Sequence, residues 1–397
     1  MASTRSHRAP SLRSIGAACG ALVIASTGLD CRRSEDWNGS FHRSEGWWYS
    51  DGAVSAELPG GKTVWLFGDT RLRDNANAMS NSIAVQDTAP GRAPAKSQIR
   101  FFVRGGQGEL LDVSKVGGLA KSSWANPLAP ERDALRLWLW PTAALVSGGR
   151  LVTAYVEMGC PVATFDTCRG YLGSMTVAGH TLVEVENPAD TPEHWRTRAT
   201  PLLDRRGRSP AANRLHWGSA LFEDGGWLYV FGTSFGPKWR PEDVKVARSV
   251  PGDVGRYERW QFLTPAGWRM LPSGPTAVDL QTVARGGATE LSVLRVVRRG
   301  RPWLVLLQQD WMDQELMVRS APADTIESTR WDGPEAGQRV RRFSLPALDP
   351  ETAGALSWSV RAHPQHSAPD QSLLVSFYSA KTAGLRFVEL PIAALLD

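Results

Sequence analysis

The sequence predicts an all-β protein, a five-bladed β-propeller, and three observations support this fold class. A β-hairpin pattern occurs five times along the 397 residues, the 38 glycines and 26 prolines fall mainly between apolar stretches, and helical periodicity is scarce. Each copy has an apolar strand, a turn and a returning apolar strand. The copies begin about 70–90 residues apart and cover residues 54–67, 140–156, 217–231, 291–307 and 358–377.

The first copy shows the pattern most clearly, with a strand over Val54–Leu58, a Pro-Gly-Gly-Lys turn and a return strand over Thr63–Phe67. The turns of the next three copies are Ser-Gly-Gly, Glu-Asp-Gly-Gly and Arg-Arg-Gly-Arg, and the fifth copy has a longer turn near Asp370. Weaker strands follow three of the hairpins and begin near Asn81, Tyr171 and Val244. Each copy is therefore expected to form a blade of about four strands.

A pair of β-sandwich domains is the rival architecture, but it does not explain five hairpins of one layout. Radial repetition explains them, because it shields the edges of each sheet. With 42% hydrophobic residues the chain can fill a large core. Three tryptophans occupy equivalent return strands and are expected in that core: Trp65, Trp227 and Trp303.

Residues 1–30 have the features of a secretory signal, a basic start followed by the apolar stretch Ile15–Leu29. We therefore expect a signal peptide at 1–30, a linker at 31–44 and one propeller domain at 45–397. Cys31 directly follows the apolar stretch, so the signal could be that of a lipoprotein, and a lipid anchor stays open. The expected location is secreted, or periplasmic and outer-surface, with no transmembrane segment.

Cys160 and Cys168 are the only cysteines in the body of the chain. An exported protein favours a disulfide between them, and no further ligands lie nearby for a metal site. We expect no required cofactor, although carboxylates and backbone oxygens in the channel could hold calcium. The net charge of +5 is scattered and accompanies no nucleic-acid motif, so an anionic envelope polymer is a more fitting partner.

Propeller geometry predicts which residues meet at one mouth of the channel. The residue that starts the first strand of a blade and the residue that ends its second strand lie at the same face. Several titratable residues hold such positions: Asp51, Asp69, Glu157, His216, Glu290, Asp310 and His363. Aspartates also cap turns and strand ends, so each residue taken alone fits a structural role as well, and Glu157 fits a loop.

Four of the 17 tryptophans lie near the same mouth: Trp47, Trp48, Trp217 and Trp311. Their rings could stack on sugars, or they could pack in the core.

The stretch from Asp51 to Arg71, with its WLFGDT segment, and the following Asn81-Ser82-Ile83 resemble the opening blade of a group of secreted bacterial propellers, mostly of unknown function. The ELSV segment after Thr289 and Ala362-His363-Pro364 resemble that group's later blades, so that the resemblance spans roughly residues 45–395. The group is similar to five-bladed glycosidase propellers, and some relatives cut the D-arabinan of mycobacterial envelopes. The resemblance implies catalytic acids at Asp51, Asp69 and Glu290. The sialidase motif Ser-x-Asp-x-Gly-x-Thr-Trp is absent.

The sequence thus predicts a glycoside hydrolase that cuts an extracellular polysaccharide, such as an arabinan-like polymer, with a pair of carboxyl groups. We assign Asp51 as base, Glu290 as acid and Asp69 as the group that orients them, an arrangement between blades that suits inversion. Substrate contacts are expected from Asn81, His216, Trp217, Asp310, Trp311 and His363. The alternatives are a noncatalytic glycan-binding or envelope-associated propeller and a purely structural one, because propellers host binders as readily as enzymes.

Overall fold

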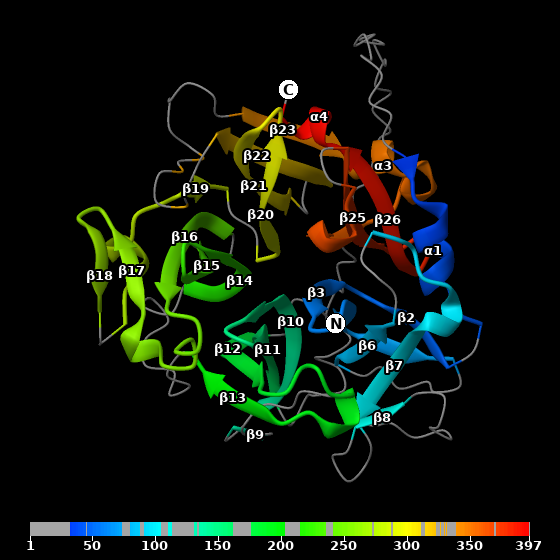
Figure 1. Ribbon diagram of the computed structural model, residues 1–397, viewed down its shortest axis with the longest axis horizontal. Coiled ribbons are helices and arrows are strands. Elements are labelled where there is room, and N and C mark those ends of the chain that lie inside the picture. Colours follow the sequence, from blue (N-terminus) through cyan, green and yellow to red (C-terminus); the bar gives the residue numbers. More distant parts are fainter. Residues whose placement is uncertain are drawn as a thin grey trace, which may run out of the picture. The chain divides into compact units, whose positions relative to one another are not determined.

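Five antiparallel sheets stand around one axis, and each contains one of the predicted hairpins (Figure 1). They belong to one compact unit, residues 31–397. The fold class is confirmed as a five-bladed β-propeller. The computed structural model describes residues 32–44, 46–73, 80–87, 91–104, 110–112, 131–132, 135–161, 176–202, 215–235, 241–271, 274–286, 289–310, 314–322, 326, 329, 331, 339–368 and 371–396.

The blades follow the chain in order, each starting with its innermost strand. Blade 1 contains β3 (Val54–Leu58), β4 (Lys62–Phe67), β6 (Ser82–Gln86), β7 (Ile99–Arg104) and β8 (Leu110–Asp112). Blade 2 contains β10 (Leu135–Ser147), β11 (Arg150–Pro161), β12 (Thr176–Val185) and β13 (Thr197–Pro201), with β9 (Glu131–Arg132) beside β10. Blade 3 contains β14 (Leu215–Asp224), β15 (Trp227–Phe235), β16 (Pro241–Ser249), β17 (Gln261–Thr264) and β18 (Gly267–Met270), with β19 (Ala284–Arg285) beside β16.

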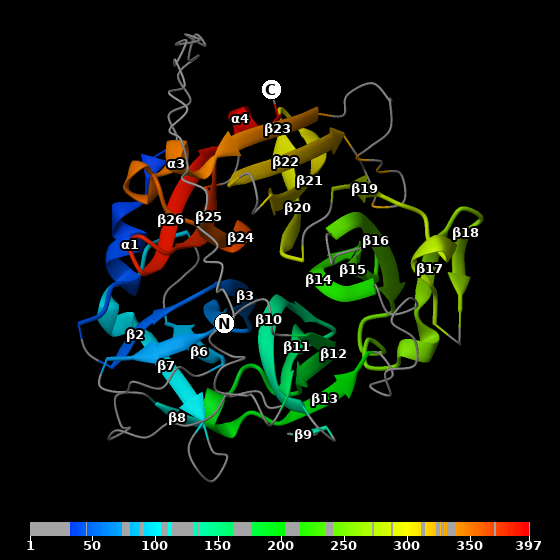
Figure 2. The same ribbon diagram turned by 180° about the vertical axis from the view of Figure 1, so that it is seen from behind.

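Blade 4 contains β20 (Leu291–Arg298), β21 (Arg301–Asp310), β22 (Glu315–Pro322) and β23 (Arg339–Ser344). Blade 5 contains β24 (Ser357–Ala362), β25 (Ser372–Ser379), β26 (Gly384–Pro391) and, at its outer edge, β1 (Arg32–Arg33). Viewed from behind, the inner strands β3, β10, β14, β20 and β24 surround the same axis (Figure 2). They run in the same sense, so the starts of all five point to one mouth.

The N-terminal segment closes the ring. Residues 31–44, expected as a linker, supply β1, which pairs with β26 of the last blade, and α1 (Glu35–Phe41). Asn38 of α1 accepts a hydrogen bond from the Phe387 amide (2.8 Å) and donates one to its carbonyl (3.2 Å). Trp37 and Phe41 are each only 4% exposed and join the core between blades 5 and 1.

Each gap between neighbouring blades is filled by an apolar cluster, so the core consists of five layers rather than one centre. The aromatic residues concentrate between blades 5 and 1, where the Trp65 and Phe387 rings lie 6.0 Å apart, edge to face. Trp65 is fully buried, as predicted. Trp227 and Trp303 are only half-buried, because they lie beside hairpin turns, and Arg248 covers the Trp227 ring at 4.0 Å.

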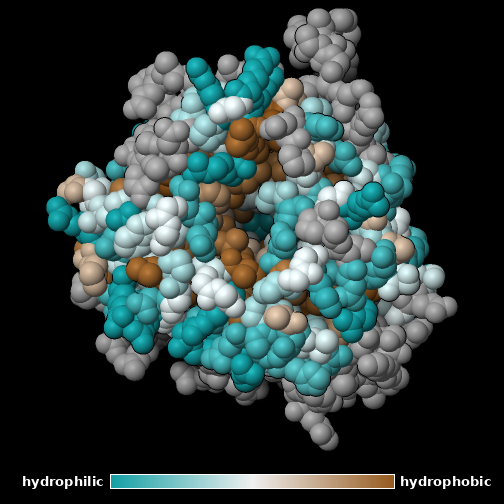
Figure 3. Space-filling model, viewed as in Figure 1, coloured by the Kyte–Doolittle hydropathy of each residue, from teal (hydrophilic) through white to brown (hydrophobic). Residues whose placement is uncertain are grey.

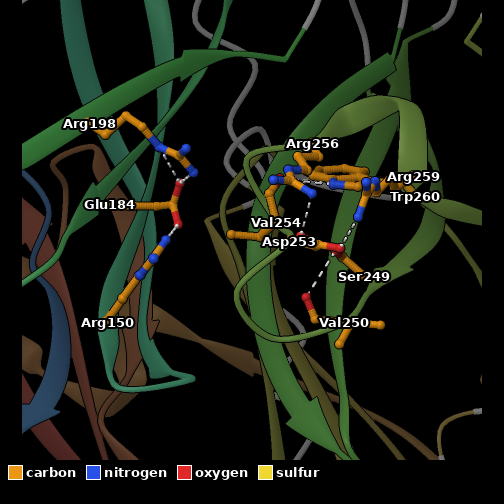
Figure 4. Close-up of polar contacts among 10 residues, drawn as sticks. All are labelled: Arg150, Glu184, Arg198, Ser249, Val250, Asp253, Val254, Arg256, Arg259 and Trp260. Carbon is orange, nitrogen blue, oxygen red and sulfur yellow. Dashed lines mark hydrogen bonds and ion pairs between the residues drawn. The ribbon is translucent and has the colours of Figure 1, made fainter.

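An ion-pair network within blade 2 lies next to a loop of blade 3 (Figure 4). Glu184 of β12, 1% exposed, accepts hydrogen bonds from Arg150 (3.0 Å) and Arg198 (3.1 Å). Gly255 of blade 3 lies against this ion pair, and a Cβ there would come within 2.6 Å of Glu184 Oε2. Within the same blade 3 loop, Asp253 pairs with Arg259 (2.9 Å).

The remaining described helices are short and lie outside the blades: α3 (Leu345–Leu348), α4 (Ile392–Leu396), η1 (Lys96–Gln98), η5 (Pro192–His194), η7 (Tyr257–Arg259), η8 (Ala277–Asp279), η9 (Pro350–Thr352) and η10 (Pro364–His366). None of the helices within the described ranges has the length and apolar character to cross a membrane. The face shown in Figure 3 is hollowed near the axis, with both polar and apolar side chains along the walls.

Candidate functional site

Two aspartates meet at the mouth end of blade 1. Asp51 lies between β2 (Trp47–Ser50) and β3, and Asp69 lies between β4 and β5 (Thr70–Leu72). The Asp51 amide donates to the Asp69 carbonyl (3.0 Å), and the Gly68 amide donates to the Asp51 carbonyl (2.9 Å). A Cβ on Gly68 would overlap the Asp51 Oδ1 atom, so only glycine leaves room for this carboxyl group.

A cavity of about 170 Å³ contains both carboxyl groups. Its lining combines acidic, basic and aromatic side chains from blades 1 and 5: Tyr49, Asp51, Asp69, Arg71, Trp358 and Tyr378. The Trp358 and Tyr378 rings lie 4.3 Å apart and form one wall. We call this cavity the mouth pocket. Its mixture of flat rings and carboxyl groups is typical of sites that bind small polar molecules.

Two indole groups fix the aspartates. Trp140 of blade 2 donates its N–H to Asp69 Oδ1 (2.9 Å), and the side chain of Trp358 hydrogen-bonds to Asp51. Each aspartate is therefore held by a tryptophan from a neighbouring blade, and its carboxyl group keeps a defined orientation.

Glu290, immediately before β20, is the third carboxyl group of the site. Ser359 of β24 donates its hydroxyl to Glu290 Oε1 (2.8 Å). Ser359 has a φ of 60°, in the left-handed region that non-glycine residues seldom adopt, within a bulge between Trp358 and Arg361. This strained backbone turns Ser359 toward Glu290, and strain of this kind is concentrated at functional sites.

Arg361 is buried next to this group, 4% exposed, and reaches from blade 5 to two other blades. Its guanidinium donates to the Leu291 carbonyl of blade 4 (3.0 Å) and the Ser219 carbonyl of blade 3 (3.4 Å). Burial lowers the pKa of Arg361, and the charge of Glu290 opposes that shift, so the two groups sense each other. Arg361 thus places a positive charge beside Glu290 within the channel.

The electrostatics single out Asp51. Burial, then the negative charges of Asp69 and Glu290, raise the pKa of Asp51 well above its ordinary value, and the bond from Trp358 opposes them. The same environment raises the pKa of Tyr378 to about 12, first through burial and then through Tyr49 and Asp51. Asp51 is therefore a carboxyl group that tends to keep its proton. A raised pKa favours a proton donor, whereas the base that the sequence suggested must be ionised.

Four of the expected substrate contacts lie in the structural core instead. Asn81 is fully buried and donates to the Leu139 carbonyl (2.8 Å), which joins blades 1 and 2. Trp217 is 1% exposed and packs 5.6 Å from the Phe262 ring. His216 is 4% exposed, and its ring lies 4.5 Å from that of His180.

His363 is the fourth of these residues and is fully buried. Its two ring nitrogens contact the hydroxyls of Ser55 (2.6 Å) and Ser376 (2.8 Å), and its ring lies 4.9 Å from that of Trp65. Burial, then the positive charges of His366 and Arg361, hold the pKa of His363 well below its usual range. It therefore acts as a neutral bridge between blades 5 and 1.

The remaining expected residues are placed only in part. The Asp310 backbone pairs with Glu315 at the end of β21, whereas its side chain, Trp311 and Cys168 lie outside the described residues. Cys160 is disulfide-bonded. Glu157, expected in a loop, is fully buried in β11 and accepts a hydrogen bond from Thr181. The calcium site is not found: within the described ranges no three His, Cys, Asp or Glu side chains are grouped to hold a metal.

The sequence reasoning gave no site role to the aromatic and basic lining of the pocket, namely Tyr49, Arg71, Trp358 and Tyr378. Two of these residues could have been found from their positions in the hairpin pattern. Trp358 begins the fifth hairpin, and Tyr378 ends its return strand, so the rule that located Asp51 and Asp69 also locates these two rings.

Comparisons with known proteins agree with this fold. A family model described as "Domain of unknown function (DUF5005)" matches residues 34–383. No curated protein matches the sequence. A candidate hydrolase from Bacteroides ovatus ATCC 8483 is similar in structure, with 18% identity, a TM-score of 0.61, and coverage of 90% of this chain and 89% of the other.

More distant structural matches include two glycosidases. An exo-1,5-alpha-L-arabinanase from a bovine ruminal metagenomic library has 13% identity, a TM-score of 0.40, and coverage of 87% and 92%. A GH43 beta-xylosidase/alpha-arabinofuranosidase from a compost metagenome has 9% identity, a TM-score of 0.41, and coverage of 86% and 89%. Similarity at this level assigns no function to the chain, and function must come from the site.

Proposed function

The chain belongs to the family described as a domain of unknown function (DUF5005), and from this premise we propose that it is an extracellular glycoside hydrolase. It would cut a polysaccharide by acid/base catalysis with carboxyl groups. The observation that carries the proposal is the environment of Asp51. This carboxyl group lies in a pocket with aromatic walls and is electrostatically coupled to two other carboxyl groups, Asp69 and Glu290.

Glycoside hydrolysis requires one carboxyl group that holds a proton and one that accepts a proton. The raised pKa of Asp51 suits the donor, which protonates the glycosidic oxygen as the bond to the anomeric carbon breaks. Glu290 would take a proton from the attacking water, whose hydroxyl adds to that carbon. These roles reverse the assignment made from the sequence. Asp69, fixed by Trp140, would keep its role of tuning Asp51 by its charge.

The substrate class follows from the walls of the pocket. Flat aromatic faces such as Trp358 and Tyr378 stack on the apolar faces of sugar rings, while carboxylates and tyrosine hydroxyls bond to sugar hydroxyls. The cavity of about 170 Å³ has room for a group of about the size of one sugar ring, so we expect cleavage at one sugar within a longer chain bound across the mouth. Arabinan-like polymers remain the first candidates from the sequence.

The test is release of reducing ends from a panel of bacterial and plant polysaccharides, with arabinans included. Asp51→Asn and Glu290→Gln should each lower turnover by about 10²- to 10⁴-fold while the protein stays folded, because each removes one proton-transfer group. Asp69→Asn should lower it less. Full activity in both Asp51→Asn and Glu290→Gln would refute the assignment.

A second variant tests position rather than chemistry. Gly68→Ala removes none of the three carboxyl groups but displaces that of Asp51, so turnover should fall. Gly39→Ala, in α1 with open space around its Cα, is the matched control and should leave turnover unchanged. If no polysaccharide is cleaved but one binds at the mouth, the noncatalytic glycan-binding function replaces the enzyme.

A further inference from the structure

We propose that the mouth carries a binding track for an anionic glycan, in which Arg71 and Arg73 recognise acidic groups on neighbouring sugars. The track is the set of side chains Trp48, Tyr49, Arg71, Arg73, Trp358 and Tyr378. It deepens the proposed function and rests on it, since it names the substrate class for the same site.

The first support is the geometry of the small sheet formed by β2 and β5. Side chains alternate along a strand, so Asp69, Arg71 and Arg73 share one face while Thr70 and Leu72 are buried on the other. Asp69 and Arg71 both line the mouth pocket, which shows that this face is the mouth side. Arg71 and Arg73 are both exposed and follow Asp69 by two and four residues.

The facing strand has a matching feature. Its register shifts between Trp47 and Tyr49, so Trp48 is the extra residue of a β-bulge. The bulge leaves both Trp48 and Tyr49 half-exposed, with their rings 4.7 Å apart, while Trp47 is buried at 2% exposure. Two aromatic rings therefore stand beside two arginines.

Each arginine is positioned by one of these rings. The Arg71 guanidinium lies 5.8 Å from the Tyr49 ring centre, and the Arg73 guanidinium lies 5.1 Å from that of Trp48. Stacking occupies the face of a guanidinium and leaves its N–H edges free to bind an anion in bidentate fashion. In the described part of the chain no carboxylate forms an ion pair with either arginine, unlike Arg386, which binds Asp349 at 2.6 Å.

The rings continue from this sheet into the pocket. Tyr49 lies 6.5 Å from Tyr378, which lies 4.3 Å from Trp358, the residue hydrogen-bonded to Asp51. A chain of sugars can stack along this line and reach the proposed proton donor. An acidic sugar would be repelled by the negative charges of Asp69 and Glu290 unless a cation lay beside its own charge. Arg71, which lines the same pocket, would supply that cation.

The experiment measures binding, so its result does not depend on catalysis. The probes are polygalacturonate and the same polymer after reduction of its carboxyl groups, and dextran sulfate with unmodified dextran. Isothermal titration at several NaCl concentrations compares the wild type with Arg71→Gln, Arg73→Gln and the control Arg341→Gln. Arg341 is an exposed arginine on β23 of blade 4, and it tests nonspecific attraction to a basic protein.

We expect the charged polymer of at least one pair to bind more tightly than its neutral partner, with affinity falling as salt rises. Arg71→Gln should weaken that binding about tenfold or more and Arg73→Gln by less, because a charge-assisted bond is lost in each, while Arg341→Gln has no effect. The arm that shows this pattern identifies carboxylate or sulfate as the recognised group.

The inference is overturned if charged and neutral polymers bind alike, if neither charged polymer binds, or if Arg341→Gln weakens binding as much as Arg71→Gln. Binding that depends on Arg71 without any cleavage would leave the track in place and reject only the hydrolase.

Discussion

The Asp51 carboxyl group is required for the proposed proton transfer, and its ionised form destabilises the folded protein because it is buried beside two other carboxyl groups. Because its pKa is raised in the folded protein, its protonated form is favoured by folding and its ionised form is disfavoured. The contribution of Asp51 to stability is therefore fully present below the pKa that Asp51 has in the unfolded chain. It is lost as pH rises through the higher pKa that Asp51 has in the folded protein. At neutral pH the ionised carboxyl group, if formed, would face Asp69 and Glu290.

We therefore predict that Asp51→Asn stabilises the protein as pH rises while it removes the proposed proton transfer. Thermal unfolding followed from pH 4 to pH 8 should show a difference in Tm between variant and wild type that is small at the acidic end and grows with pH. Asp87→Asn is the control, because Asp87 is a surface partner of Lys62 (3.0 Å) and its loss should bring no gain. A variant less stable than the wild type at pH 8 would contradict the assigned environment.

Sequence reasoning named the three carboxyl groups, and the structure buries four of the side chains that were expected to contact substrate near them. Asp51, Asp69 and Glu290 lie at strand ends, and the topology alone brings the ends of inner strands to one mouth. His363 follows the same strand as Trp358, but the bulge between Trp358 and Arg361 breaks the alternation, and the histidine lies between blades. A local change in register of this kind has no signature in a single sequence, so the direction of a side chain beyond a bulge cannot be predicted.

At the scale of elements, the hairpins were predictable because their determinants are local. Glycines at φ of 56° and 77° make the turn at Gly148 and Gly149, and apolar strands flank it. The contacts between blades depend on residues far apart in sequence. The surroundings of Glu184 are an example. This carboxylate binds arginines from two strands of its own blade (Figure 4). Gly255 of the neighbouring blade packs against it, where a Cβ would come too close.

This network predicts unequal effects on stability for two glutamates that lie two residues apart, Glu184 and Glu186. Glu184→Gln should lower the free energy of unfolding by about 1–3 kcal/mol, because it removes a buried carboxylate that binds two arginines. Glu186→Gln should cost less than about 1 kcal/mol, since its pair with Arg196 spans 3.5 Å and both side chains are largely exposed. Urea unfolding of the two variants checks this, and equal losses would mean that the buried network adds no more stability than the exposed ion pair.

The whole molecule is a ring, and a ring needs a joint between its last and first blades. The joint consists of α1 and β1 from the N-terminal segment together with the aromatic cluster between blades 5 and 1. This role was hard to predict, since a seven-residue helix between a predicted signal and a predicted domain has the composition of a linker. Trp37 and Phe41 are the part of the segment that signals burial, because large aromatic side chains rarely remain exposed.

The joint predicts that the stability of N-terminally truncated chains falls sharply once α1 is removed. A chain that starts at residue 32 should fold like the full-length chain, because it keeps β1 and α1. A chain that starts at residue 45, where the domain was expected to begin, should lose several kcal/mol, because removal of a buried aromatic side chain alone costs about 3–5 kcal/mol. The double variant Trp37→Ala, Phe41→Ala in the longer chain is the matched control and should reproduce most of that loss with the backbone of α1 still present.

Thermal unfolding and binding of a hydrophobic dye measure the effect of truncation. The same boundary bears on where a signal peptide could be removed. The predicted signal should be removed between Leu29 and Glu35, which N-terminal sequencing of the native protein can establish. Cleavage at the start of this window keeps the joint intact, whereas cleavage at its end would remove β1 and free the edge of β26. A truncated chain from residue 45 that melts with the full-length chain would show that the blades close without the N-terminal segment.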